Sequence, residues 1–306
     1  MKALRYHDYN GPLTLDEVPE PACGHGQLRV RTLASSVNPI DWKLYSGALR
    51  FLRPIPRPAI PGLDVVGEVL ESKAEGFSVG ERIVARVADV PGGVMAEQCL
   101  VTPEVAVRLP EGVSVEHAAA LPLAGMTALQ GLRDDCGMRL EGEDRRVLVV
   151  GASGGVGHYA VQLAHHAGAH VTAVCSGKRA EVVRELGADE VIDYRERDDF
   201  GEVPYDLIID CAARAPWSRF RSVLSAEGHL SQPTPSGAWI WPILTSKRVH
   251  FTRLVPTASD LQILVDRVAS GTMRSIVGAS FAWTDLADAW ALNQKGGTEG
   301  KIVLTW

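Results

Sequence analysis

The stretch Arg146 to Ser176, RVLVVGASGGVGHYAVQLAHHAGAHVTAVCS, decides the fold of this chain. Its first residues, Arg146–Val150, form an apolar run rich in β-branched side chains, which is typical of a buried strand. A glycine-rich turn follows at once. Small and apolar residues then recur at helical spacing from Tyr159 to Ala167, Gly168 ends that helix, and Val171–Val174 indicates a second buried strand. The pattern predicts a βαβ unit with a parallel sheet.

The glycines of the turn GASGGVG have separate physical roles in such a unit. Gly151 allows the tight turn out of the strand, Gly154 lets a pyrophosphate approach the backbone, and Gly157 lets the helix pack closely on the sheet. Amides at the helix start then face the phosphates. The spacing is that of the dinucleotide-binding fingerprint GxGxxG with Ala152 in the place of the first glycine, and its position between strand and helix favours nucleotide binding over an unliganded turn.

The residues after the second strand discriminate between the two nicotinamide cofactors. An NAD-binding unit has an acidic residue here that accepts hydrogen bonds from the ribose hydroxyls, whereas a carboxylate would repel a 2′-phosphate. This chain has no acid at that point and instead has Ser176, Lys178 and Arg179. The sequence therefore favours NADPH. The alternative is that Lys178 and Arg179 only lie on the solvated first turn of the next helix.

Size and composition limit the class of protein. The chain has 306 residues, of which 46% are hydrophobic and 22% charged, so it can bury a full core and is long enough for two domains. Its net charge of −6 argues against a nucleic-acid or anionic-membrane partner, and no apolar run approaches the roughly 18 residues of a membrane span. With no signal-peptide pattern after Met1, we expect a cytoplasmic protein that acts on a small molecule.

Cysteine usage predicts free thiols and no metal site. The five cysteines form no CxxC pair and have no histidine at ligand spacing, so neither a disulfide framework nor a zinc site is expected. They are Cys23, Cys99, Cys136, Cys175 and Cys211.

Residues 1–122 have the pattern of a compact β domain. Short alternating segments broken by Gly and Pro predict four strands: Leu28–Leu33, Asp64–Leu70, Arg82–Ala88 and Ala96–Val101. From Val115 the pattern becomes helical, and Pro122 should break that helix.

Helices and strands alternate after Ser176, which predicts a doubly wound parallel sheet. The expected elements are a helix over Ala180–Leu186, strands over Val191–Asp193, Tyr205–Asp210 and His229–Ser231, helices over Leu261–Ser270 and Asp285–Asn293, and a strand over Lys301–Thr305. The last strand belongs more naturally to the β domain. We therefore expect a β domain over 1–122, a Rossmann domain over 123–255 and a return to the β domain over 256–306.

Three other segments leave alternatives open. The polar stretch Ser36–Lys43 presents side chains at a cleft or closes a loop through Asx turn chemistry. The proline-rich stretch Leu49–Pro61, with three arginines, is a solvated loop or a basic flap that meets an anionic substrate tail. Trp239–Pro242 lines the cleft or belongs to the core.

Six motifs in order carry a family resemblance that covers essentially the whole chain. They are VNPIDWKL (37–44), PGLDVVGEV (61–69), ALPLAGMTALQGL (120–132), GASGGVG (151–157), LGADEVIDY (186–194) and GKIVL (300–304). The chain resembles the zinc-independent medium-chain dehydrogenase/reductases of the quinone oxidoreductase (zeta-crystallin-like) and enone or enoyl reductase group. The resemblance implies an α/β protein with a GroES-like catalytic domain made from both chain ends, a Rossmann domain between them, a cleft where they meet, NADPH as the hydride donor, and a homodimer.

The resemblance also implies roles for particular residues. Those matched to the cofactor are Asn38 and Thr127 beside the nicotinamide, Ser153, Gly154, Gly155 and Val156 at the pyrophosphate, Ser176 and Lys178 at the 2′-phosphate, and Tyr194 at the adenosine end. We expect Arg179 and Lys301 to bind the cofactor as well. Asp41 and Lys43 match the polar pair beside the nicotinamide. We expect Lys43 and the Asn38 amide to stabilise negative charge on the substrate, with water or a side chain such as Tyr45 as the proton donor.

Two departures from related families shape the functional prediction. Gly62-Leu63-Asp64 stands where zinc alcohol dehydrogenases have Gly-His-Glu, so polarisation by zinc is not expected. The common Gly-Ala-Tyr-Ala-Glu-Tyr segment has lost both aromatics, with Met95 and Gln98 in their places, which weakens the case for a quinone-stacking site. We therefore predict an NADPH-dependent reductase of α,β-unsaturated carbonyls. The alternatives are an NADPH:quinone oxidoreductase and an NADPH-binding protein without turnover.

Overall fold

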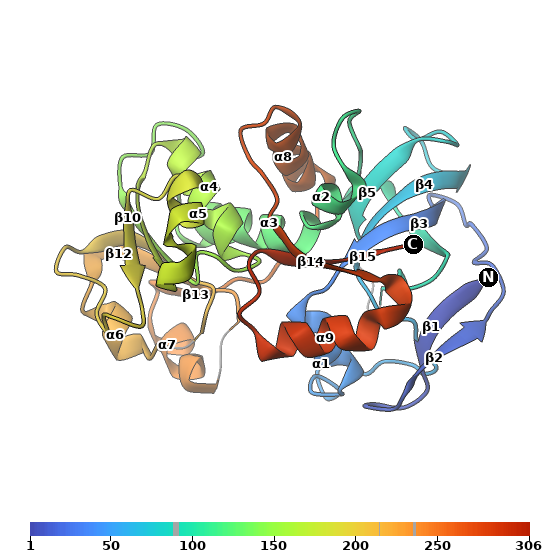
Figure 1. Ribbon diagram of the computed structural model, residues 1–306, viewed down its shortest axis with the longest axis horizontal. Helices are drawn as coiled ribbons and strands as arrows, with labels where there is room; N and C mark the ends of the chain where they lie inside the picture. The colour runs from blue at the N-terminus through green and yellow to red at the C-terminus, as the bar shows by residue number, and fades with distance from the viewer. Residues whose placement is uncertain (88–91, 214, 235–236) are drawn as a thin grey trace. The chain divides into compact units, whose positions relative to one another are not determined.

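The computed structural model describes residues 1–87, 92–213, 215–234 and 237–306 (Figure 1). These residues fall into two compact units. One unit combines Met1–Leu123 with Pro256–Trp306, and the other is Ala124–Val255. The first unit is rich in antiparallel strands, and the second contains a parallel sheet with helices on both faces.

The parallel sheet of the second unit has six strands in the order β10-β9-β8-β11-β12-β13. They are β8 (Arg146–Val150), β9 (His170–Cys175), β10 (Glu190–Asp193), β11 (Tyr205–Asp210), β12 (Leu224–Gln232) and β13 (Val249–Phe251). The chain moves outward from β8 in one direction and then returns to build β11 on its other side, so the sheet is doubly wound, as the alternating pattern predicts.

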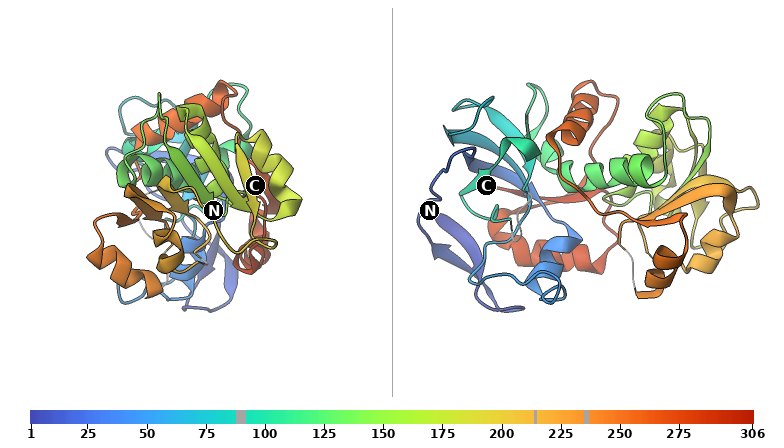
Figure 2. Two further views of the ribbon diagram at one scale, coloured as in Figure 1. Left: turned by 90° about the vertical axis from the view of Figure 1, so that its left-hand side faces the viewer. Right: turned by 180° about the vertical axis from the view of Figure 1, so that it is seen from behind.

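Helices cover both faces of this sheet (Figure 1, Figure 2). Its helical segments are α3 (Pro122–Gln130), η2 (Gly131–Asp135), α4 (Gly157–Ala167), η3 (Gly177–Arg179), α5 (Ala180–Glu185), α6 (Trp217–Arg221), η4 (Gly237–Trp239) and α7 (Ile240–Thr245). α4 and α5 lie on one face, whereas α6 and α7 lie on the other, where Phe220 and Trp239 join the apolar core.

The tryptophans near the start of α7 have different environments. Trp239 is buried in the core, whereas Trp241 is 74% exposed. The sequence left cleft lining and core packing open for this stretch, and the structure assigns Trp239 to the core. Pro235 and Ser236, shortly before this stretch, lie outside the described residues.

The mainly antiparallel sheet of the first unit, in which only β14 and β15 are paired in parallel among the described strands, is centred on β3, which pairs with β4, β6 and β15. The strands are β1 (Lys2–Tyr6) and β2 (Leu13–Glu17), which form a separate pair, then β3 (Leu28–Ser36), β4 (Asp64–Ser72), β5 (Arg82–Arg86), β6 (Gln98–Val101), β7 (Ala106–Arg108), β14 (Val277–Ala282) and β15 (Lys301–Thr305). β15 therefore joins the sheet begun by residues almost three hundred positions earlier in the sequence.

The helices of this unit also bring distant parts of the chain together. They are α1 (Pro39–Tyr45), η1 (Pro103–Val105), α2 (Val115–Ala119), α8 (Ala258–Ala269), η5 (Trp283–Asp285) and α9 (Leu286–Lys295). α1 and α9 lie side by side (Figure 1), and Trp42 Nε1 donates a hydrogen bond to Asn293 Oδ1 at 3.0 Å. The break expected at Pro122 is confirmed, because α2 ends at Ala119 and α3 begins at the proline.

Element ends differ from the predictions where polar residues continue a strand. β3 extends past Leu33 because the Ser35 hydroxyl donates to the Asp64 carbonyl at 2.6 Å and the Ser36 hydroxyl donates to the Asp64 carboxylate at 2.8 Å. β5 ends at Arg86, and Ala88, where we expected the strand to end, lies outside the described residues. β14 was missed because its residues are only intermediate or exposed, so no buried run marks it.

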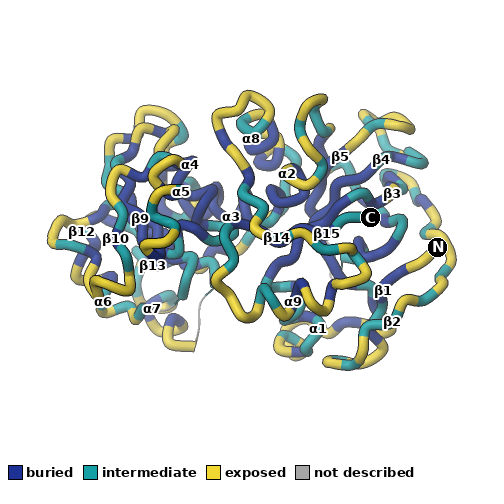
Figure 3. The backbone as a smooth tube through the Cα atoms, viewed as in Figure 1, coloured by how far each residue is buried: buried dark blue, intermediate teal, exposed yellow. Residues whose placement is uncertain are grey.

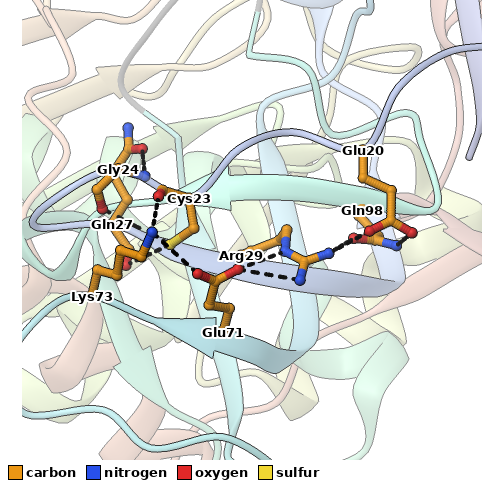
Figure 4. Close-up of polar contacts among 8 residues, drawn as sticks. All are labelled: Glu20, Cys23, Gly24, Gln27, Arg29, Glu71, Lys73 and Gln98. Atoms are coloured by element: carbon orange, nitrogen blue, oxygen red, sulfur yellow. Dashed lines mark hydrogen bonds and ion pairs between the residues drawn. The ribbon is translucent and has the colours of Figure 1, made fainter.

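A polar network lies on β3 and its neighbours (Figure 4). Arg29 forms ion pairs with Glu20 and Glu71 and donates a hydrogen bond to Gln98 Oε1 at 2.8 Å. Gln98, at one of the two positions where the resemblance implied an aromatic residue, is thus directed into this network. Met95, at the other lost aromatic position, is buried in the apolar core.

We expect Gly67→Ala to destabilise the protein, because a Cβ at this position in β4 would lie 2.3 Å from Val30 Cγ1 and 2.4 Å from the Arg31 carbonyl oxygen. The free energy of unfolding should fall by about 1–3 kcal/mol, as in other overpacked cores. Denaturant unfolding measures this change. Gly237→Ala is the matched control, since no heavy atom lies within 4 Å of its added Cβ. Equal stability of the two variants would contradict this packing.

Candidate functional site

The glycine turn of the second unit has the geometry of a dinucleotide site. Gly151 leaves β8 with a φ of 77°, which favours glycine. A Cβ on Gly157, the first residue of α4, would lie 2.2 Å from the Gly151 carbonyl oxygen, so only glycine lets the helix start this close. A Cβ on Gly154 would meet only that same oxygen, at 3.3 Å. The outer side of the turn is open beside the start of α4, where helix amides lack intrahelical acceptors.

Residues predicted for the 2′-phosphate lie next to this turn. Ser176 directly follows β9, and Lys178 and Arg179 belong to η3. The Arg179 guanidinium donates a hydrogen bond to Ser153 Oγ in the glycine turn at 3.5 Å. Tyr194 follows β10, half-exposed, and its amide donates to the Cys175 carbonyl at 3.2 Å. The structure thus gathers these side chains at the carboxyl ends of β8, β9 and β10.

An acid that the sequence reasoning did not consider also reaches this region. Asp193 is the last residue of β10, and a Cβ on Gly177 would lie 2.4 Å from its Oδ2. Asp193 lies 17 positions after Ser176 in the sequence, so the residues that directly follow β9 do not reveal it. The neighbouring strand supplies a carboxylate to the same place because β9 and β10 end side by side.

These residues fit a nicotinamide dinucleotide. The open glycine turn and the start of α4 suit a pyrophosphate, and the hydroxyl and cations after β9 suit a further phosphate. When bound, such a cofactor supplies a hydride. Thr127, predicted beside the nicotinamide, is a buried residue of α3.

The other predicted residues belong to the first unit and surround a buried carboxylate, Asp64. Asn38 Nδ2 donates to Asp64 Oδ2 at 2.8 Å and to the Ser36 carbonyl at 3.3 Å. Lys301 Nζ, from β15, donates to Asn38 Oδ1 and to the Val37 carbonyl. Both polar ends of the Asn38 amide are therefore held by charged groups, which fixes its orientation.

Asp41 and Arg86 complete the cluster. The backbone N–H of Asn38 donates a hydrogen bond to Asp41 Oδ2 at 2.8 Å, and this arrangement caps α1. Arg86 Nε lies 3.6 Å from Asp64 Oδ1. Two acids and two cations are therefore buried together, with Asp64 fully inaccessible and Lys301 only 4% exposed. We name this set, Asn38, Asp41, Asp64, Arg86 and Lys301, the buried charge cluster.

Burial shifts the titration of these groups. The pKa of Asp41 is raised to about 7. Loss of hydration on burial is the larger cause, and the neighbouring Asp64 carboxylate is the second. Burial lowers the pKa of Lys301, while the charges of Asp64 and Asp41 oppose that change. Asp41 Oδ1 and Asp64 Oδ1 accept no hydrogen bond within the described residues.

The four residues proposed for chemistry differ in whether they are available to a substrate. Both amide hydrogens of Asn38 are used inside the cluster, and Asp41 caps α1. The Tyr45 hydroxyl donates to the Gly11 carbonyl at 2.5 Å, and burial raises its pKa. Lys43 is half-buried on α1, and its ammonium has no hydrogen bond or ion pair to any described residue. Lys43 is the member of this set with an uncommitted donor.

Asp64 and Arg86 were not among the predicted site residues. Their signal in the sequence is a charge inside an otherwise apolar strand, Asp64 at the start of DVVGEV and Arg86 at the end of RIVAR. A buried strand tolerates such a charge only when it is paired. Lys301, which we expect at the cofactor, donates a hydrogen bond to Asn38 in the first unit, and its place at the cofactor stays a prediction.

Among the described residues, no group of three or more His, Cys, Asp or Glu side chains could hold a metal ion. No helix in this part of the chain is both long enough and apolar enough to cross a bilayer. The fold and the glycine turn define a two-domain oxidoreductase that uses a nicotinamide cofactor.

Comparisons with known proteins identify the family. Residues 24–111 match the alcohol dehydrogenase GroES-like domain, and residues 186–304 match the zinc-binding dehydrogenase family. The chain is 37% identical to the chloroplast envelope quinone oxidoreductase homolog of Arabidopsis thaliana, over 99% of this chain and 98% of the relative. It is 28% identical to the 2-methylene-furan-3-one reductase of Solanum lycopersicum, over 99% and 79% of the two chains.

A solved structure supports the same assignment. The quinone oxidoreductase of Thermus thermophilus, described with its NADPH complex, aligns over 100% of both chains with a TM-score of 0.76 and 28% identity. The chain belongs to the medium-chain dehydrogenase/reductase family, in its zinc-independent quinone and enoyl reductase group. It is an oxidoreductase with a GroES-like domain and a Rossmann-type sheet.

We expect Asp41→Asn to flatten the pH dependence of stability. A carboxyl whose pKa rises from 3.8 to about 7 on folding contributes stability fully below pH 3.8 and loses it as the pH rises through about 7. Between these values the free energy of unfolding of the unmodified protein should fall relative to the variant, by at most about 1.4 kcal/mol per pH unit.

Denaturant unfolding at a series of pH values measures the difference. The exposed Asp288→Asn on α9 controls for the loss of one acidic residue. If the difference in stability between the unmodified protein and Asp41→Asn were constant across this pH range, the buried titration of Asp41 would be ruled out.

Proposed function

We propose that the protein is an NADPH-dependent, metal-free reductase that delivers hydride to the β-carbon of an α,β-unsaturated carbonyl, such as an enone, enal or enoyl thioester. The observation that carries this proposal is the uncommitted ammonium of Lys43, which lies on the helix that Asn38 and Asp41 cap. Addition of hydride to such an alkene develops negative charge on the carbonyl oxygen. An ammonium that lies over the Trp42 ring but forms no hydrogen bond or ion pair with a described residue is suited to stabilise that charge.

In this reaction, some residues of the first unit would contact the substrate and others would hold those residues in position. Lys43 holds the carbonyl oxygen, and the buried charge cluster keeps α1, and therefore Lys43, in position. The α-carbon then takes a proton from water or a side chain. Tyr45 could act only after it releases the Gly11 carbonyl, so water is the simpler source.

Reduction of quinones is the second candidate function. The Arabidopsis thaliana and Thermus thermophilus proteins carry the name quinone oxidoreductase, which favours this alternative. Against it, the two aromatic positions expected for ring stacking hold Met95, in the core, and Gln98, in the surface network. A protein that binds NADPH without turnover, the third alternative, would have no need of the uncommitted Lys43.

A paired panel of acceptors tests this proposal. NADPH oxidation is measured with enones, enoyl thioesters and quinones, with analysis of the products. We expect higher kcat/KM for alkenes, one stereochemical outcome, and a loss of kcat on the order of a hundredfold in Lys43→Met with NADPH affinity unchanged. Exclusive reduction of quinones, or full activity of Lys43→Met, would overturn the assignment.

The preference for NADPH is supported by the side chains after β9. We expect Lys178→Ala to weaken NADPH binding roughly tenfold and NADH binding little, because a charge-assisted hydrogen bond to the 2′-phosphate would be lost. Asp193→Asn is the complementary variant, and it should tighten NADPH relative to NADH because it removes a carboxylate from the same region. Fluorescence titration gives both constants, and equal losses for the two cofactors in Lys178→Ala would contradict the assignment.

We further propose a cytoplasmic homodimer. Its support is β13, the last strand of the parallel sheet, which follows α7 directly and ends in the half-exposed Phe251. On α7, Trp241 and Leu244 are 74% and 75% exposed. A second copy could cover this apolar edge. Sedimentation equilibrium should give a dimer that Phe251→Asp weakens, and a monomer at micromolar concentration would contradict it.

A further inference from the structure

The segment Trp42–Leu63 of the first unit differs sharply in charge from the rest of the chain. It contains Lys43, Arg50, Arg53 and Arg57 and no Asp or Glu, so its formal charge is +4 in a chain whose net charge is −6. The rest of the chain therefore carries −10. This separation concentrates positive charge in one segment of the surface.

The three arginines of this segment have no anionic partner. All three are exposed, and their guanidinium groups make no ion pair or hydrogen bond to any described residue. Arg50 instead lies 4.8 Å from the ring centroid of Phe51, and Arg57 lies 4.1 Å from that of Tyr9. Their charges are therefore available to an anion from outside the protein.

The same segment carries its two most exposed large apolar side chains side by side. Phe51 is 87% exposed and Leu52 is 82% exposed. The backbone beside α1 is drawn as largely exposed in Figure 3. Prolines at 54, 56 and 58 restrict the backbone of the unfolded chain here, so ordering the segment that carries Phe51 and Leu52 costs little conformational entropy.

We propose that this segment, residues 50–57, docks the protein on an anionic lipid surface. Phe51 and Leu52 enter the boundary between headgroups and acyl chains, and Arg50, Arg53 and Arg57 bind the lipid phosphates. Neither the insertion of two apolar side chains nor a basic patch binds a membrane strongly by itself, but the two together give stable attachment. The expectation of no membrane partner used the net charge, which averages over the whole surface and hides this local excess.

A lipid surface explains the segment better than the anionic substrate tail that the sequence left open. Phe51 and Leu52 are both more than 80% exposed, so they project from the surface and do not line a concave site. A single bound molecule needs a concave site that covers most of its surface, whereas a bilayer covers a projecting tip.

The docking segment is also close to the buried charge cluster. Ile55 of the segment belongs to the same core cluster as Leu44 of α1, the helix that Asn38 and Asp41 cap. A protein attached through this segment would hold its reaction residues near the membrane surface. The docking itself does not depend on which acceptor is reduced.

Vesicle flotation tests the proposal. The unmodified protein should float with vesicles of phosphatidylcholine and phosphatidylserine, should bind phosphatidylcholine vesicles weakly, and should lose binding as salt is raised. Arg50→Gln/Arg53→Gln/Arg57→Gln should lower the partition coefficient about a hundredfold, since each basic residue near an anionic surface contributes roughly fivefold. Phe51→Ser/Leu52→Ser should also lower it while leaving reduction of a soluble enone unchanged.

Matched controls separate a local effect from a general one. Arg139→Gln/Arg221→Gln/Arg274→Gln removes the same charge from other exposed positions and should bind like the unmodified protein, as should Leu15→Ser/Val79→Ser. Absence of binding to anionic vesicles at low salt, or equal losses in the control variants, would overturn the proposal. So would a triple arginine variant that binds vesicles normally but loses kcat/KM only for phosphorylated thioesters. Failure of the enone assay with vesicle binding intact would instead count against the proposed function alone.

Discussion

A carboxylate with no access to water imposes the central constraint on the first unit. The Asp64 carboxyl group is fully buried and needs polar partners in place of water, and it obtains them from β3, β5 and the capped start of α1. Asn38 in turn binds Lys301 from β15, so five separate segments meet around one charge. Substitution of any partner leaves a buried group uncompensated. The position of α1, and with it that of Lys43, follows from this requirement.

The two sites differ in how far the sequence could predict them. Around the nucleotide turn, the informative residues lie within one βαβ unit, because neighbouring parallel strands end at the same edge, and the predicted strand Arg146–Val150 is confirmed residue for residue. The buried charge cluster draws on residues 38, 41, 64, 86 and 301, and no local pattern indicates that these parts of the chain meet. Asp193 was missed for the same reason, since its nearness to Gly177 depends on strand pairing. Edge strands such as β14 lack the buried runs that periodicity detects.

In the first unit, the polar side chains fixed by hydrogen bonds are different residues from the one whose charge is available to a substrate. Asn38 is saturated with hydrogen bonds and Asp41 is committed to the helix cap, whereas the Lys43 ammonium on the same short helix lies 5.7 Å from the centroid of the Trp42 ring and has no hydrogen bond or ion pair to a described residue. An uncommitted cation contributes little to stability, so its retention fits a functional role better than a structural one. The saturated groups supply the fixed geometry that such a cation needs to act on a developing negative charge.

Because β15 lies near the end of the chain and pairs with β3, the sheet of the first unit can be completed only late in synthesis. Residues 36–86 leave the ribosome long before Lys301, so Asn38 must wait for this hydrogen-bond donor while the whole nucleotide-binding unit is being made. Domains generally fold as units during translation, and Ala124–Val255 is contiguous in the chain. The nascent protein can therefore form its parallel sheet before the antiparallel sheet begun by its first residues is complete. Until then, the strands on either side of Asp64 are exposed to chaperones and to pairing with other chains.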